Sequence, residues 1–245
     1  MIRALFLLFG VAAYLIFFAT FLYLIAFVGN LPGVPRTIDR GPEEAAGVAL
    51  AINLALVALF GVQHSVMARP GFKAIWTRAV PVPVERSVYV LFASLTLLLL
   101  FLLWRPMPAV IWDIANPVGA AIMWTLFAAG FAIVLVTTFL LSHFELFGLK
   151  QVWLNLRGQT SASLPLAQPL FYRLVRHPLY TGFFMAFWAT PHMTAGHLLF
   201  ALAMSAYMLI GIRYEERDLV AHFGGDYEDY RRRVGMLAPR LRKRA

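Results

Sequence analysis

The sequence predicts an all-α integral membrane protein with about five transmembrane helical regions. Of its 245 residues, 61% are hydrophobic and only 13% are charged, which excludes the surface of an ordinary soluble domain. Long apolar runs recur along the chain, each near or above the roughly 20 residues that a helix needs to cross a bilayer. There is no cysteine, so disulfides, thiolate metal ligands and a cysteine nucleophile are excluded.

The first 141 residues carry four apolar runs that predict four spans. The first run follows a single arginine, Arg3, and is longer than the roughly 7–15 residues of a signal-peptide core. No small-x-small cleavage site closes it, so we expect it to be retained as an anchor. The four predicted spans lie near residues 4–28, 46–67, 88–104 and 119–141.

The remaining chain predicts a loop, a helical hairpin and a C-terminal helix. Residues 142–178 contain Pro165, Pro169 and a polar run that starts at Gly158, which favours a cytoplasmic loop with short helical pieces. The apolar region 179–212 is too long for one ordinary span and is interrupted at residues 191–197. We therefore expect a hairpin over 179–214, then a cytoplasmic helix and tail over 215–245. No repeat or linker divides the sequence, so residues 1–245 are predicted to form a single domain.

The basic residues indicate the orientation in the membrane. Cytoplasmic segments carry an excess of Lys and Arg, and all but three of the 21 such residues fall on one side if the N-terminus is cytoplasmic. The exceptions are Arg36, Arg40 and Arg105. This arrangement places both termini and the Arg-His-Pro segment in the cytoplasm, and it explains the net charge of +9 without nucleic-acid binding. The basic tail from Arg240 either contacts anionic headgroups or is a solvated end.

The segment Arg176-His177-Pro178 predicts an extended turn followed by a helix start, because the residue before proline avoids helical geometry and proline suits the first helical turn. The exposed amides and positive dipole end of that helix, with Arg176 beside them, are suited to a carboxylate or phosphate. Gly182 permits the close approach of another backbone or a flat ring. The alternative is that this segment only caps a helix at the headgroup boundary.

Two adjacent carboxylates, Glu215 and Glu216, follow at the end of the last apolar region. Neighbouring side chains on a helix point about 100° apart, so one is expected to face a cavity while the other pairs with Arg213 or Arg217. The alternative is a solvated ionic helix. Two tyrosines that follow, Tyr227 and Tyr230, are either ligand contacts or interface anchors.

Together these motifs resemble the S-adenosylmethionine-binding end of isoprenylcysteine carboxyl methyltransferases and related membrane methyltransferases. The pattern is Arg-His-Pro-x-Tyr-x-Gly followed by Glu-Glu-x-x-Leu-x-x-x-Phe-Gly-x-x-Tyr-x-x-Tyr, over about residues 172–231. The resemblance implies that S-adenosyl-L-methionine is the cofactor and S-adenosyl-L-homocysteine its product. The implied cofactor-binding residues are Arg176, His177, Pro178, Tyr180, Gly182, Glu215, Glu216, Tyr227 and Tyr230.

Three further segments, residues 63–69, 83–87 and 143–153, resemble the NnrU-like branch of these methyltransferases, including bacterial thiol methyltransferases within it. This resemblance implies a multi-pass protein of the bacterial inner membrane that methylates a small thiol, converting methanethiol to dimethyl sulfide.

Methyl transfer from a sulfonium mainly requires alignment and a dry pocket, and the acceptor must react as a thiolate. His64 and His143 each lie at the end of an apolar run, so either is a candidate base; the alternative is that both are packed, hydrogen-bonded histidines. We expect a small acceptor pocket near the ends of the second and fourth spans. Its predicted substrate residues are Gln63, Ser65 and Glu145.

Other functions are less well supported by the sequence. His64, His143, Glu145 and His177 do not have the spacing of a metal site on one helix face, and no Gly-x-Gly-x-x-Gly loop indicates a Rossmann fold. An NADPH-dependent membrane reductase remains an alternative, because such proteins share a similar C-terminal pattern. A non-catalytic NnrU-like assembly factor is the third possibility. The sequence gives no indication of oligomeric state.

Overall fold

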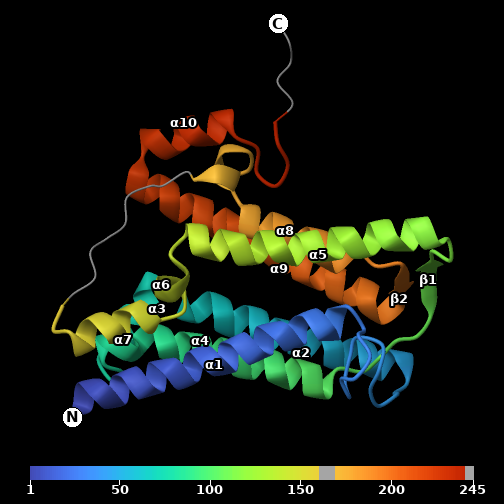
Figure 1. Ribbon diagram of the computed structural model, residues 1–245, viewed down its shortest axis with the longest axis horizontal. Coiled ribbons are helices and arrows are strands. Elements are labelled where there is room, and N and C mark those ends of the chain that lie inside the picture. The colour runs from blue at the N-terminus through green and yellow to red at the C-terminus, as the bar shows by residue number, and fades with distance from the viewer. Residues whose placement is uncertain (160–168, 241–245) are drawn as a thin grey trace, which may run out of the picture. The chain divides into compact units, whose positions relative to one another are not determined.

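The computed structural model describes residues 1–159 and 169–240 (Figure 1). The predicted polar loop around Pro165 and the basic tail after Arg240 lie outside these residues. The described chain is almost entirely helical, with two very short strands. The elements are α1 (Ile2–Val28), α2 (Ala46–Met67), α3 (Pro70–Trp76), α4 (Val82–Leu103), β1 (Val110–Asp113), α5 (Pro117–Leu140), α6 (His143–Leu146), α7 (Leu149–Leu156), the 3-10 helix η1 (Leu170–Arg173), α8 (Pro178–Trp188), β2 (His192–Thr194), α9 (Ala195–Phe223) and α10 (Gly225–Arg233).

Within the described residues, the helices α1, α2, α4, α5 and α9 are long and apolar enough to cross a membrane. This confirms the predicted all-α membrane fold and the positions of the first four spans. The third span begins at Val82, six residues before the apolar run that predicted it. Pro83 lies in the first turn of this helix, where its missing N–H costs no hydrogen bond. The charged residues Glu85 and Arg86 interrupt the apolar pattern, so the apolar run begins later than the helix.

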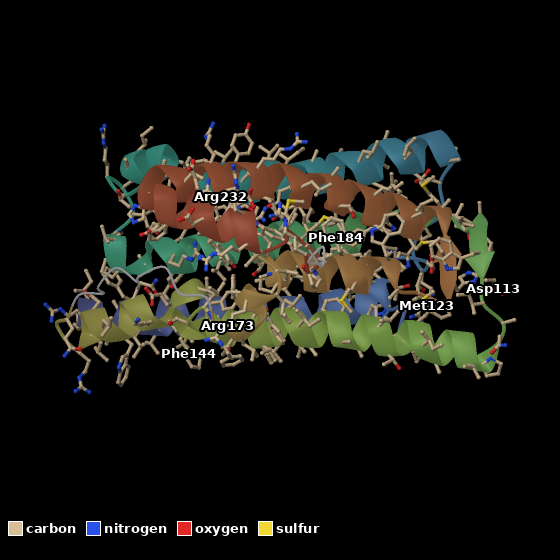
Figure 2. All side chains as sticks on the ribbon, turned by 90° about the horizontal axis from the view of Figure 1, so that it is seen from above. Asp113, Met123, Phe144, Arg173, Phe184 and Arg232 are labelled. Atoms are coloured by element: carbon tan, nitrogen blue, oxygen red, sulfur yellow. The ribbon has the colours of Figure 1, made fainter. Side chains whose placement is uncertain are left out.

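Large apolar side chains remain exposed along these helices. On α5 they include Val118, Ile122, Leu126 and Phe139, and Figure 2 shows this helix, on which Met123 is labelled, bordered almost entirely by carbon. Helices that are apolar all round belong in a membrane. The protein is therefore a multi-pass membrane protein.

Contacts within the chain define two compact units. The first unit consists of residues 1–113, 142–159 and 192–200, and the second of residues 114–141, 169–191 and 201–240. The prediction of a single domain stays a prediction.

In the first unit, α4 packs against α1, α2 and α7. An aromatic core forms at one end, where Phe27 lies 4.8 Å from Phe101 between ring centroids and Trp104 donates its indole N–H to the carbonyl of Ile38. At the other end, Gly148 has φ of +89° and lies against the backbone of Ser87, so only glycine can start α7 this close to α4. Strands β1 and β2 pair antiparallel within the same unit.

In the second unit, α5 and α8 cross in direct backbone contact. A Cβ added to Gly182 would lie 2.6 Å from the carbonyl oxygen of Gly130, and one added to Gly130 would lie 2.6 Å from the carbonyl oxygen of Gly182. The predicted close approach at Gly182 is therefore made by another backbone, that of α5.

The predicted terminal hairpin consists of a short helix and a long one. Helix α8 has 11 residues and α9 has 29, so α9 extends nine residues beyond the predicted boundary at residue 214. His177, just before α8, contacts Glu216 near the end of α9, so the start of α8 lies beside the last part of α9.

Candidate functional site

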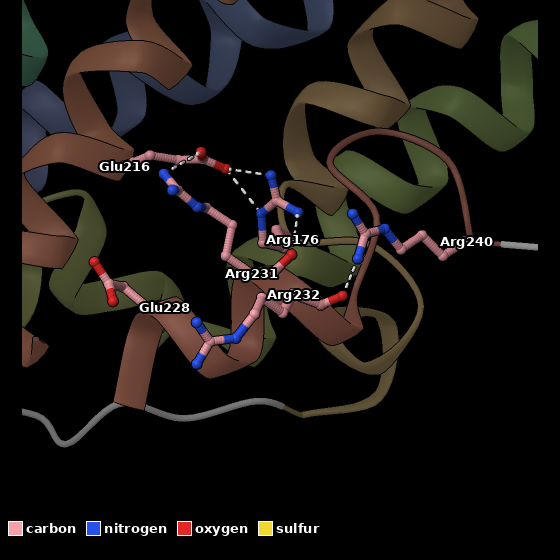
Figure 3. Close-up of a pocket in the computed structure, with 6 residues that line it drawn as sticks. All are labelled: Arg176, Glu216, Glu228, Arg231, Arg232 and Arg240. Atoms are coloured by element: carbon pink, nitrogen blue, oxygen red, sulfur yellow. Dashed lines mark hydrogen bonds and ion pairs between the residues drawn. The ribbon is translucent and has the colours of Figure 1, made fainter. Parts of the chain in front are cut away.

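Arg176 and Glu216 form the centre of a charged cluster in the second unit (Figure 3). The Nε and Nη2 atoms of Arg176 lie 2.8 and 2.7 Å from the same carboxylate oxygen, Oε1 of Glu216. Nη1 of Arg176 donates to the main-chain carbonyls of Val234 and Arg231, at 2.5 and 3.2 Å. Four of the five guanidinium N–H groups are thus used inside the chain. The predicted anion-binding arginine joins α8, α9 and the end of α10.

His177 lies between the two predicted carboxylates. Its Nε2 is 3.1 Å from Oε1 of Glu216, and its Nδ1 is 3.9 Å from Oε2 of Glu215. The Glu216 side chain is 13% exposed, whereas that of Glu215 is 46% exposed. We call Arg176, His177 and Glu216 the C-terminal clamp. Glu216 is the inward carboxylate, and it contacts Arg176 and His177.

Arg217, a predicted partner of the second carboxylate, makes other contacts. It lies 3.8 Å from Asp218 and 5.1 Å above the ring of Tyr214. Both contacts are local to α9, and the described neighbour of the exposed Glu215 carboxylate is His177.

The chain after α10 returns to the Arg-His-Pro segment. The amides of Arg176 and His177 donate to the carbonyls of Gly235 and Met236, at 2.8 and 3.1 Å. Thr181 Oγ1 donates to the carbonyl of Leu237 at 3.0 Å. Pro178 starts α8 as predicted, but the main chain itself covers part of this helix start.

Buried tyrosines stand beside the clamp. Tyr230 Oη donates to the carbonyl of Tyr172 at 2.6 Å, and burial raises the pKa of Tyr230 to about 12. Burial, together with the charge of Glu216, raises the pKa of Tyr227. Tyr227 is 2% exposed, yet its hydroxyl has no hydrogen-bond partner among the described residues. A buried hydroxyl without a partner is costly, which makes this atom a candidate for contact with a ligand.

Tyr180 lies beside the clamp on the first turn of α8. Its ring centroid is 5.8 Å from that of His177. Its hydroxyl lies 3.6 Å from the position that a Cβ on Gly211 of α9 would occupy. Tyr180 therefore bridges α8 and α9 next to the carboxylates.

A pocket of about 640 Å³ opens beside the clamp (Figure 3). Its lining combines four guanidinium groups with two carboxylates, and Arg231 Nη1 lies 3.8 Å from Oε2 of Glu216. The residues that line it are Arg176, Glu216, Glu228, Arg231, Arg232 and Arg240. Sequence reasoning missed Glu228, Arg231, Arg232 and Arg240, although the spacing of Glu228, Arg231 and Arg232 places them on neighbouring faces of one helical turn after Tyr227.

The first unit contains a second group of polar residues, at the end of α2. His64 Nε2 lies 2.8 Å from the hydroxyl of Tyr89, and Arg86 lies with its guanidinium carbon 4.9 Å from the centroid of the Tyr89 ring. We call His64, Arg86 and Tyr89 the N-terminal cluster. Tyr89 and Arg86 were not among the predicted site residues.

Gln63 and Ser65, the predicted substrate residues on either side of His64 in the sequence, form hydrogen bonds with other residues. Gln63 donates to the sulfur of Met67 at 3.1 Å and accepts from Thr96 at 3.2 Å. The carbonyl of Ser65 accepts a hydrogen bond from Arg69. Gln63 therefore ties α2 to α4 beside the cluster.

His143, the other candidate base, begins α6 and is 5% exposed. Its Nε2 lies 2.9 Å from the hydroxyl of Tyr14, and burial lowers its pKa. The predicted substrate residue Glu145 forms an ion pair with Lys150 at 2.7 Å. Among the residues that the structure describes, no group of three or more His, Asp or Glu side chains is arranged to hold a metal ion.

Comparison with known proteins identifies the family. The family model described as NnrU protein matches residues 52–239. The chain belongs to the NnrU family. This family match covers the histidine, arginine and tyrosine of the N-terminal cluster as well as the C-terminal clamp.

Curated relatives of this family member are similar over nearly the whole chain. A methanethiol S-methyltransferase of Mycobacterium tuberculosis is 53% identical over 237 residues, which cover 97% of each chain. Methanethiol S-methyltransferase 1 of Bradyrhizobium diazoefficiens is 54% identical over 95% of this chain and 81% of its own length. Nurim of Sus scrofa is 28% identical over 86% of this chain and 87% of its own length. No solved structure matches.

Proposed function

We infer that this protein is a membrane-bound thiol S-methyltransferase that converts methanethiol to dimethyl sulfide. The observation that carries this inference is 53% identity, over 97% of both chains, to a relative named for methanethiol methylation. A match of that extent includes both units and both polar groups, so the function does not rest on the fold alone.

We propose S-adenosyl-L-methionine as the methyl donor, with S-adenosyl-L-homocysteine as the product. The residues present suit such a molecule. The volume of about 640 Å³ lies within the usual range of small-molecule pockets, guanidinium groups of Arg231, Arg232 and Arg240 suit a carboxylate, and carboxylates suit an ammonium or ribose hydroxyls. The unpartnered hydroxyl of Tyr227, among the described residues, is a further polar contact for a nucleoside. When bound, the sulfonium supplies an electrophilic methyl group.

The C-terminal clamp gives Glu216 a fixed orientation for this role. Oε1 is occupied by Arg176 and His177, whereas Oε2 has a looser contact, 3.8 Å from Arg231. Oε2 is therefore the oxygen that is better placed to receive a ligand. We propose that Arg176, Pro178 and Gly182 act by holding this geometry, while His177, Tyr180, Glu215, Glu216, Tyr227 and Tyr230 surround the donor.

The acceptor thiol must lose its proton, because the thiolate is the nucleophile. We propose that His64 or His143 accepts it. Each imidazole is hydrogen-bonded through Nε2 to a tyrosine hydroxyl, which fixes the ring and gives the proton a route. Gln63, Ser65 and Glu145 are proposed to shape the acceptor site, with Glu145 acting through its ion pair to Lys150.

The proposed location is the bacterial inner membrane, with both termini in the cytoplasm. The relatives named for methanethiol methylation in Mycobacterium and Bradyrhizobium are bacterial, and the excess of Lys and Arg falls on the side of the C-terminal clamp. That orientation exposes the donor site to the compartment where a soluble nucleotide is available.

Isothermal titration of the purified protein with S-adenosyl-L-homocysteine and with NADPH tests the cofactor directly. We expect binding of the sulfur nucleotide and none of NADPH. Binding of NADPH instead would support a membrane reductase, and binding of neither would support an assembly factor.

Competition with a prenylcysteine tests the size of the acceptor pocket. We expect methanethiol turnover to be insensitive to a prenylcysteine. Inhibition at a concentration comparable to that of methanethiol would show a much larger acceptor site.

A further inference from the structure

Arg86 is a half-buried cation near the start of α4 that has no carboxylate partner in the part of the chain the structure describes. Its Nε donates to the carbonyl of Leu146 on α6 at 2.7 Å. The neighbouring carboxylate of Glu85 lies instead 4.0 Å from Lys73. Within residues 1–159 and 169–240, the two terminal nitrogens of Arg86 therefore have no hydrogen-bond acceptor.

This position favours a bound anion. Arg86 is half-buried near the start of a long apolar helix, where a charge is costly unless it is paired or functional. An anion bound by the terminal nitrogens would offset this cost.

The surroundings of Arg86 indicate which kind of anion fits. Its guanidinium lies over the ring of Tyr89, whose hydroxyl is 2.8 Å from Nε2 of His64. Tyr89 is buried in a cluster with Met67 and Val90, against which aromatic side chains pack. Aromatic rings and methionine make favourable contacts with sulfur, so this place suits a small, soft sulfur anion better than a large hydrated one. The packed aromatic residues are Phe17, Phe72, Trp76 and Phe147.

We propose that Arg86 is a catalytic residue that holds the sulfur of the acceptor as a thiolate, while Tyr89 passes the acceptor's proton to His64. This inference rests on the proposed function. The thiol S–H proton moves to Tyr89 Oη as the Tyr89 O–H proton moves to His64 Nε2. The thiolate then forms the new C–S bond to the donor's methyl carbon, the electron pair of the broken bond leaves with the donor's sulfur, and His64 later releases its proton to solvent.

Among the residues that the structure describes, no arginine lies over the tyrosine ring of the second histidine–tyrosine pair. His143 is bonded to Tyr14, and the cation near it along the chain, Lys150, is paired with Glu145 at 2.7 Å. Arg86, which has no carboxylate partner among the described residues, lies over the ring of Tyr89. Because Tyr89 is bonded to His64, the structure assigns the proton transfer to His64 rather than to His143.

The test uses the full-length protein with Arg86→Gln and, as a matched control, Arg78→Gln. Arg78 is an exposed arginine between α3 and α4, so its replacement removes the same charge without touching the N-terminal cluster. We expect Arg86→Gln to lower kcat/KM for methanethiol by about 100-fold, the effect of losing a preorganised donor to a developing anion. Arg78→Gln should stay within about twofold of wild type, as surface substitutions usually do.

Thiocyanate, a small soft anion, gives a readout that is independent of turnover. It should compete with methanethiol in the wild type and displace it at least about tenfold less well in Arg86→Gln, while the affinity for S-adenosyl-L-homocysteine stays unchanged in both. Unaltered kcat/KM together with unaltered thiocyanate inhibition in Arg86→Gln would overturn the inference. A wild type that forms no dimethyl sulfide would instead contradict the proposed function.

Arg86→Gln is judged misfolded if it fails to bind S-adenosyl-L-homocysteine. In that case Tyr89→Phe tests the proposed proton transfer instead. This variant keeps the ring under Arg86 but removes the hydroxyl. We expect retained thiocyanate inhibition with a loss of roughly 10²-fold in kcat, typical of a lost proton-transfer group. Near-native kcat, or loss of thiocyanate inhibition, would overturn the inference.

Discussion

The C-terminal clamp and the N-terminal cluster differ in whether their charged side chains have partners of opposite charge. In the clamp, Glu216 lies beside Arg176, His177 and Arg231, and most of the Arg176 N–H groups donate to acceptors within the chain. In the cluster, Arg86 has a carbonyl and an aromatic ring but no described carboxylate. The opposite charges of the clamp thus lie side by side within the chain, whereas the cation of the cluster gains most from a bound anion. The difference suggests that the clamp mainly fixes geometry for the donor, while the cluster acts on the reacting sulfur.

Glu216→Gln should break the clamp and give the largest effect. The side chains of Arg176 and Glu216 are only 9% and 13% exposed, and removing one partner of a buried pair typically costs about 3–5 kcal/mol. We expect a clear drop in the thermal unfolding temperature in detergent and at least a tenfold loss of affinity for S-adenosyl-L-homocysteine.

Glu215→Gln is the matched control for this prediction. Its side chain is 46% exposed and lies 3.9 Å from His177, so the unfolding temperature should change little, and any loss of affinity should be smaller. Unchanged nucleotide affinity in both variants would remove the two carboxylates from the donor site.

Gly182→Ala should loosen the scaffold that carries the clamp. The added Cβ would meet the carbonyl of Gly130 at 2.6 Å, and such overpacking typically costs about 1–3 kcal/mol. Gly47→Ala provides the control, because nothing lies within 4 Å of the added Cβ. If Gly182→Ala unfolds at the same temperature as Gly47→Ala, the contact between α5 and α8 is looser than described.

Sequence patterns predicted the features that depend on local composition. The long apolar runs predicted the spans, and Arg176-His177-Pro178 predicted the start of α8. They did not predict the pairing of Arg176 with Glu216, 40 residues apart, or of Tyr14 with His143, 129 residues apart. Such contacts depend on how helices pack, and an arginine three or four positions away on the same helix, such as Arg213, appears equally good in a sequence. Glu228 and Arg231 lie within one helical turn and could have been grouped from their spacing, but that they line a pocket with Arg176 depends on packing.

Tyr227→Phe separates a ligand contact from a structural one. The Tyr227 hydroxyl is buried without a partner among the described residues, so its removal should leave the free protein equally stable or slightly more stable. Affinity for S-adenosyl-L-homocysteine should fall by roughly tenfold, the value of about one hydrogen bond. A loss of stability with unchanged affinity would assign Tyr227 to the scaffold.

The stability of the first unit should depend weakly on pH through His143. Burial lowers its pKa in the folded protein, so below about pH 6.5 the unfolded chain binds a proton that the folded chain does not. Stability is therefore complete above about pH 6.5 and falls as the pH falls below it, by at most about 1.4 kcal/mol per pH unit. Thermal unfolding of wild type and His143→Gln at pH 7.5 and 5.5 measures this, and an equal pH dependence in both proteins would contradict it.

Transfer of a labelled methyl group tests the central claim most directly. Purified protein in lipid vesicles is supplied with methanethiol and S-adenosyl-L-methionine that carries a trideuterated methyl group, and the headspace is examined by mass spectrometry. We expect dimethyl sulfide with one deuterated methyl, formed in equal amount to S-adenosyl-L-homocysteine and formed more slowly in Glu216→Gln. Binding of S-adenosyl-L-homocysteine without formation of labelled dimethyl sulfide would contradict the assignment of methanethiol as the acceptor.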